Sequence, residues 1–82
     1  MSAVELLEET VHIEQHASSR AMAKVICCRA SELLAEGQRP DALYAALDLL
    51  YHRFRDEGHV VERDAMAEVM DWFDDEGLSQ TA

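Results

Sequence analysis

The chain has 82 residues, of which 17 are acidic and 7 basic, so its formal net charge is −10. This length allows one domain, residues 1–82, and the 49 % hydrophobic content excludes a chain that is disordered throughout. Only 3 glycines, 1 proline and 2 cysteines occur, which excludes a turn-rich β fold and a disulfide scaffold. The negative charge argues against direct binding of nucleic acid, because phosphates repel an acidic surface.

The first expected element is a long helix over residues 3–36. A Ser-x-x-Glu capping box at Ser2 begins it, and Gly37 ends it. Apolar residues keep to one helical face through both halves without a change of phase, which favours an unbroken helix. The one candidate break is Ser18-Ser19, which contains neither glycine nor proline. A break there would instead produce a four-helix bundle.

Two shorter helices follow, over residues 40–57 and 60–76. Pro40 suits a first helical turn, and Gly58 ends the helix that it begins. The short connection makes the two helices an antiparallel hairpin. Residues 78–82 are expected to form a frayed tail. The predicted fold is therefore all-α, with three helices of which the first is the longest.

The unequal helix lengths predict a homodimer. At 1.5 Å per residue the first helix would be about 50 Å long, whereas each of the others would be about 25 Å. The hairpin could then cover only half of the first helix. An apolar stripe near the N-terminus would stay uncovered, and such stripes usually mark an interface. The predicted dimer interface consists of Val4, Leu7 and Val11.

A weak candidate metal site lies on the opposite face of the first helix, at Glu5, Glu9, His12 and His16. Histidines spaced i, i+4 on a helix can chelate a divalent metal, and Glu9-x-x-His12 has the spacing used in carboxylate-bridged metal bundles. A second Glu-x-x-His is missing from the sequence. A solvated polar face with two incidental histidines is therefore the favoured interpretation, and no metal is predicted.

The sequence contains no pattern that indicates an enzyme or a cofactor. Cys27 and Cys28 are adjacent, so on a helix they point about 100° apart and cannot easily form a disulfide. Cys28 is expected at the edge of the apolar face and Cys27 on the far side. The three glycines are isolated helix stops and form no phosphate-binding loop. No catalytic residue and no cofactor are predicted.

The last helix carries more apolar surface than one neighbour requires. One stripe, from Val61 to Trp72, can supply the core, and a second stripe beside it contains two methionines, which suit adaptable partner surfaces. Acidic residues follow at the C-terminus of the helix, where they oppose the helix dipole. An ordinary core stripe and a solvated helix end are the alternatives. The predicted partner-binding residues are Met66, Met70, Asp71, Phe73, Asp74, Asp75 and Glu76.

The charge is unevenly distributed along the chain. Residues 1–14 carry −4, residues 15–55 carry +2 and residues 56–76 carry −8. The basic part of the first helix is expected to lie near the acidic last helix. The remaining acidic patches would steer association with a basic partner.

These observations predict a small, acidic, non-enzymatic protein–protein interaction module. It would act as an inhibitor or adaptor of a basic protein, such as one that handles nucleic acid, through its acidic and apolar helix faces. In size and charge the chain resembles small phage-encoded inhibitors of host defence, including anti-CRISPR proteins, and that resemblance implies an anti-defence role. The alternatives are a small helical chaperone or subunit of a larger assembly, such as a secretion system, and a metal-binding bundle. Because the sequence has no secretory signal and no membrane-length apolar run, it is expected in the cytoplasm.

Overall fold

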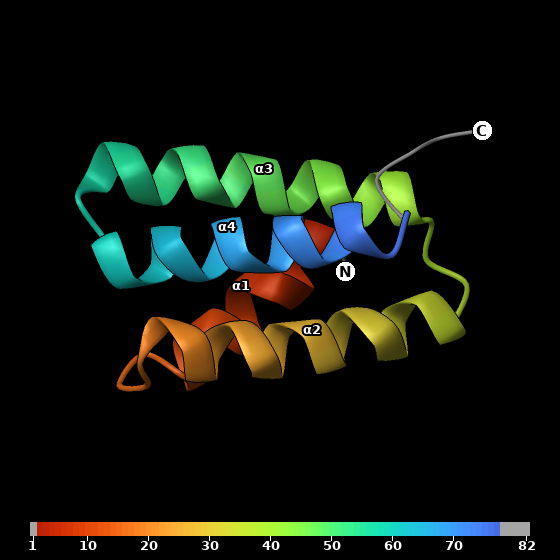
Figure 1. Cartoon of the computed structure of the whole chain (residues 1–82), viewed down its shortest axis with the longest axis horizontal. Helices are drawn as coiled ribbons and strands as arrows, with labels where there is room; N and C mark the ends of the chain where they lie inside the picture. The colour runs from red at the N-terminus through yellow and green to blue at the C-terminus, as the bar shows by residue number, and fades with distance from the viewer. Residues whose placement is uncertain (1, 78–82) are drawn as a thin grey trace.

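The computed structural model describes residues 2–77, which fold into four α-helices and contain no strand (Figure 1). The all-α prediction is confirmed. The predicted frayed tail, residues 78–82, lies outside the described residues. No helix in the described part of the chain is long and apolar enough to cross a membrane. The four helices are α1 (Ala3–Ile13), α2 (Ser19–Ala35), α3 (Pro40–Glu57) and α4 (Val60–Asp75).

The unbroken first helix is wrong, and the alternative break near Ser18-Ser19 is confirmed. The chain leaves the helical path after Ile13, and Ser18 has extended backbone angles, with φ −66° and ψ 162°. Its hydroxyl accepts a hydrogen bond from the backbone N–H of Ala21 at 3.2 Å. Serine is among the strongest helix N-caps, because its oxygen satisfies a backbone donor that the first turn leaves unpaired. Ser18 therefore starts a new helix without help from glycine or proline.

The predicted hairpin of the last two helices is confirmed. Helix α3 begins at Pro40, and Gly58 ends it in the left-handed conformation with φ +76°. The backbone N–H of His59 donates to the carbonyl of Phe54 at 2.9 Å, which satisfies a carbonyl at the end of the helix. Only glycine adopts this backbone conformation without strain. The turn leads directly into α4, which ends at Asp75.

The four helices form a bundle in which chain order and spatial order differ. Helices α1 and α4 each pack against both α2 and α3. In Figure 1, α4 lies between α2 and α3 on the near side, and α1 crosses obliquely behind. The pairs α1–α2 and α3–α4 therefore form opposite sides of the bundle. Its longest dimension is 34 Å, which leaves no room for a helix of about 50 Å.

All four helices contribute to a single core, and this corrects the predicted dimer interface. Leu7 is fully buried and Val11 is 5 % exposed, whereas Val4 is half-buried against the same core. The break lets α1 fold back over α2 and α3, so one chain covers the stripe by itself. The expectation that Val4, Leu7 and Val11 remain uncovered is wrong. The homodimer stays a prediction, but no uncovered stripe at Leu7 and Val11 supports it.

Candidate functional site

A groove with acidic sides runs between α3 and α4, and we refer to it as the acidic groove. It encloses about 200 Å³. Three aspartates stand around two tyrosines and a methionine, and His52 is the only basic side chain among the described residues that line it. The lining residues are Tyr44, Asp48, Tyr51 and His52 from α3, and Ala67, Met70, Asp71 and Asp74 from α4.

The two tyrosine rings are held by their neighbours. The ring of Tyr44 meets the buried ring of Phe73 edge to face, with centroids 6.2 Å apart and planes at 65°. Tyr51 packs against the core and meets the ring of His52 at 5.5 Å. His52 Nε2 lies 3.4 Å from an oxygen of Asp48, one helical turn away. The aromatic floor is therefore preorganised by the core beneath it.

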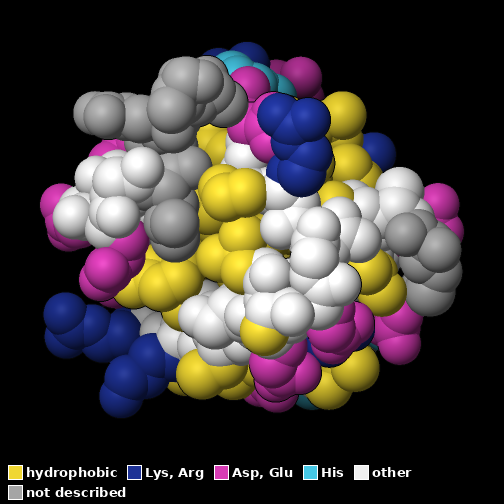
Figure 2. Space-filling view, turned by 90° about the vertical axis from the view of Figure 1, so that its right-hand side faces the viewer, with side chains coloured by type: hydrophobic (Ala, Val, Ile, Leu, Met, Phe, Trp, Pro, Cys, Tyr) yellow, Lys and Arg dark blue, Asp and Glu magenta, His cyan; other side chains and the backbone are white. Residues whose placement is uncertain are grey.

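The electrostatic potential of the groove is negative. The pKa of the Tyr44 hydroxyl is raised above its ordinary value, first by partial burial and then by the charges of Asp74, Asp48 and Asp71. Each of these carboxylates repels the negative charge that the Tyr44 oxygen would carry after losing its proton. The same potential favours a bound cation. At the end of the bundle that is on the right in Figure 1, hydrophobic side chains also reach the surface between acidic ones (Figure 2).

The structure separates the predicted partner-binding residues into three groups. Met70, Asp71 and Asp74 line the acidic groove. Met66 and Phe73 are fully buried, so they present no surface to a partner. Asp75 and Glu76 are exposed at the end of α4 but do not line the groove.

Met66 and Phe73 are buried because α4 has two neighbouring helices. The sequence prediction assumed that α4 packs on one neighbour through the stripe from Val61 to Trp72. In the structure α4 packs on both α2 and α3, so its core face lies between the two predicted stripes. Val61 at one edge is 41 % exposed as a result. The buried residues of α4 are Ala65, Met66, Val69 and Phe73.

The sequence prediction omitted the half of the groove that α3 supplies. Tyr44, Asp48, Tyr51 and His52 follow one another at i, i+4, i+7 and i+8, so they share one face of that helix. This spacing was a usable signal. The signal is ambiguous in the sequence. Tyr51 also fits the apolar stripe of α3, and an acidic residue such as Asp48 is usually only a solvated side chain on a helix surface.

The candidate metal site is not supported. Helix α1 ends at Ile13, so His16 lies in the following turn and the helical spacing between His12 and His16 is lost. Glu5 instead accepts a hydrogen bond from the Ser2 hydroxyl at 3.3 Å. Among residues 2–77, no group of three or more histidine, cysteine and acidic side chains is placed to hold a metal ion.

The two cysteines have the opposite placement from the prediction. Cys27 is half-buried against the core, and Cys28 is exposed. The sequence predicts one apolar face along a continuous helix over residues 3–36. The break changes which side of α2 faces the core. Burial raises the pKa of the Cys27 thiol to about 11, with smaller contributions from Cys28 and Glu68. The Cys27 thiolate is therefore scarce at neutral pH.

We expect alkylation by iodoacetamide at about pH 8 to modify Cys28 much faster than Cys27, because only about one Cys27 thiol in a thousand is ionised there. Both cysteines lie on one tryptic peptide, residues 25–29, so tandem mass spectrometry of that peptide assigns the modification to each cysteine and measures both rates. Cys28→Ser should remove the fast reaction and Cys27→Ser should leave it. Between about pH 9 and 11 the folded state should lose stability, because the folded chain holds the Cys27 proton more tightly than the unfolded chain. Equal rates for the two thiols at pH 8 would contradict this.

Comparison of the chain with protein-family models, with curated proteins and with solved structures finds no match. Its function is therefore inferred from the chemistry of its surface.

Proposed function

We propose that this chain is a small, acidic, non-enzymatic module that binds a basic segment of another protein in the acidic groove. The observation that supports this most directly is the set of carboxylates from two helices, Asp48, Asp71 and Asp74, around the floor of Tyr44, Tyr51 and Met70. A lysine or arginine side chain is the natural occupant of such a site.

Three physical contributions favour a basic segment there. Carboxylates form charge-assisted hydrogen bonds with guanidinium and ammonium groups. Tyrosine rings attract cations that lie within about 6 Å of the ring centre. The flexible thioether of Met70 can adapt to the apolar stem of a long basic side chain. A single exposed ion pair contributes only about 0–1 kcal/mol to the binding free energy. Binding therefore depends on the combination of the carboxylates, the tyrosine rings and Met70.

The net charge of −10 adds a long-range contribution. It draws a basic protein surface toward the module and accelerates encounter at low salt. A module that covers such a surface would act as an inhibitor or adaptor in the cytoplasm. A protein that handles nucleic acid is a suitable target, because its basic surface would be blocked. An anti-defence role remains part of this proposal through the compositional resemblance to phage-encoded inhibitors.

The first test compares two double variants that remove the same charge. Asp48→Asn with Asp71→Asn changes the groove, whereas Asp75→Asn with Glu76→Gln changes exposed residues outside it. An arginine-rich peptide is titrated into each protein and followed by calorimetry and NMR. We expect the groove variant to bind about tenfold more weakly, because two partly exposed charge contacts are lost. The control variant should lose clearly less affinity for the peptide.

Equal losses in the two variants would show that only total charge matters, and the groove would then have no special role. NMR shifts that avoid Tyr44 and Met70 would exclude the groove in the same way. Binding that hardly changes between about 0.05 and 0.5 M salt would favour the chaperone or subunit alternative, whose affinity comes from apolar surface. Affinity purification of the wild type beside the groove variant identifies the partner as the basic protein that only the wild type retains.

A further inference from the structure

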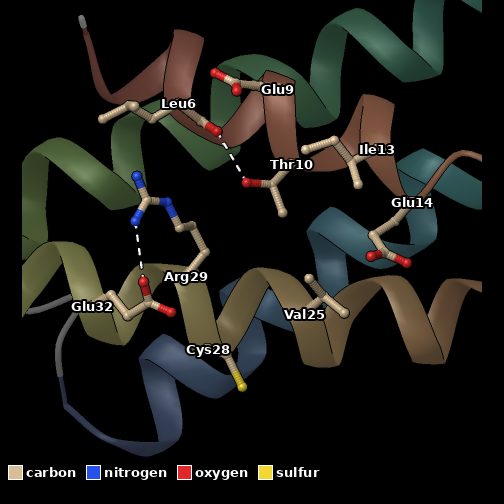
Figure 3. A pocket seen from close by; sticks show the side chains of 9 residues that line it. All are labelled: Leu6, Glu9, Thr10, Ile13, Glu14, Val25, Cys28, Arg29 and Glu32. Atoms are coloured by element: carbon tan, nitrogen blue, oxygen red, sulfur yellow. Dashed lines mark hydrogen bonds and ion pairs between the residues drawn. The ribbon is translucent and has the colours of Figure 1, made fainter.

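A second groove lies on the opposite side of the bundle, between α1 and α2, and we refer to it as the apolar groove. It encloses about 340 Å³. Figure 3 shows Ile13 of α1 and Val25 of α2 pointing into the space between the two helices. Its lining residues are Leu6, Glu9, Thr10 and Ile13 from α1, Glu14 at the C-cap of α1, and Val25, Cys28, Arg29 and Glu32 from α2.

The apolar part of this groove is open to solvent. Ile13 is 70 % exposed, the largest exposed fraction among the exposed large hydrophobic side chains of residues 2–77, and Val25 is 37 % exposed. Leu6 continues the apolar surface along α1 and is half-buried against the core. The Thr10 hydroxyl donates to the carbonyl of Leu6 at 3.1 Å, so its proton is already engaged. The centre of the groove therefore favours an apolar occupant.

The rim of the groove is acidic. Glu9, Glu14 and Glu32 carry three carboxylates, and Arg29 is the one basic side chain among the described residues that line the groove. The guanidinium of Arg29 lies 3.2 Å from Glu32 and 4.0 Å from Glu36, both on its own side of the groove (Figure 3 shows the first). Its charge is therefore already compensated locally. Glu9 on α1 and Glu14 at its C-cap remain to meet positive charge on an occupant.

We propose that the apolar groove docks an amphipathic basic helix of a partner protein. The apolar face of that helix would cover Ile13 and Val25, and its lysine or arginine residues would lie opposite Glu9 and Glu14. A groove between two helices accepts such a helix through side chains at i, i+3 and i+4. A second copy of this chain is a poorer occupant, because a two-fold interface would bring the same acidic rims together.

The test uses a designed helical peptide of leucine and lysine, and a second peptide in which glutamate replaces each lysine. Binding is measured by calorimetry, and its place by NMR shifts of the Ile13 and Val25 methyl groups. We expect only the leucine–lysine peptide to bind and to shift these methyl groups. Ile13→Ser, which removes apolar contact without changing charge, should weaken binding by at least about tenfold. Leu49→Ser is the matched control, since Leu49 is 47 % exposed on α3 and lines neither groove.

Both variants replace exposed side chains, so their melting temperatures should stay close to that of the wild type. Equal binding of the two peptides would overturn the proposed charge complementarity. Unchanged binding by Ile13→Ser, or shifts at Met70 instead of Ile13, would overturn the proposed location. Concentration-dependent shifts of the Val25 methyl groups without peptide, abolished by Ile13→Ser, would assign the groove to a second copy. None of these outcomes affects the Asp48 and Asp71 test, which concerns the opposite side of the molecule.

Discussion

Replacing Phe73 with alanine should lower the free energy of unfolding by about 3–5 kcal/mol. The side chain is fully buried, and its ring meets those of Tyr44 at 6.2 Å and Trp72 at 5.2 Å. Truncation removes these contacts and leaves a cavity that the surrounding helices cannot fill completely. A domain of this size has a total stability of about 4–12 kcal/mol, so the variant should be close to unfolding.

Urea unfolding followed by circular dichroism measures this effect, and Val61→Ala is the control on the same helix. Val61 is 41 % exposed, so its truncation should cost less than about 1 kcal/mol. If Val61→Ala destabilised the chain as much as Phe73→Ala, the core face of α4 would be the stripe expected from sequence. A Phe73 variant that folds normally but loses a partner would restore its predicted role in binding.

Leu7→Ala should destabilise the protein by about 2–5 kcal/mol, and the effect should not depend on protein concentration. Leu7 is fully buried within a single chain because α1 packs against α2 and α3. In the predicted long-helix dimer the same residue would lie at a subunit interface, where mass action makes stability depend on concentration. The two arrangements therefore predict different behaviour for one substitution.

Unfolding curves at two protein concentrations, about a hundredfold apart, separate these arrangements, with light scattering as a second readout. Ile13→Ala is the matched control, because Ile13 lies on the same helix and is 70 % exposed. We expect it to change stability by less than about 0.5 kcal/mol. A midpoint that rises with concentration in the wild type, and no longer does so in Leu7→Ala, would show that Leu7 mediates a dimer after all.

Much of the fold could be predicted from local features. Pro40 at a first helical turn and Gly58 at a helix end delimit α3 in the sequence, and the structure confirms both. Both residues act through their own backbone conformation, which hardly depends on distant contacts. Ser2 is confirmed as the N-cap, since its side chain accepts a hydrogen bond from the Glu5 N–H, but the Glu5 carboxylate accepts from the Ser2 hydroxyl and completes no capping box with the Ser2 backbone. The break at Ser18 has an equally local signal, an N-cap serine. The apolar residues of both halves nevertheless fit one continuous helical face, which favoured an unbroken helix in the sequence prediction.

The candidate site could be predicted only in part. The second apolar stripe of α4 pointed to Met70, and the acidic residues at the end of the helix pointed to Asp71 and Asp74; all three line a groove. Their counterparts on α3, Tyr44 and Asp48, become relevant only because the two helices are neighbours. The apolar groove was also beyond prediction, because Ile13 and Val25 come together only when α1 folds back beside α2.

The sequence by itself determined that this chain is helical, where its hairpin turns, and that its charge is concentrated toward its ends. These properties depend on residues close together in the chain, through backbone conformation, capping and apolar period. Only the tertiary structure decided which apolar residues form the core and which remain at the surface. A helix face is buried or exposed according to how many neighbours it has, and α4 has two. For that reason Met66 and Phe73 belong to the core, whereas Ile13 on α1 and the side chains of the acidic groove remain at the surface.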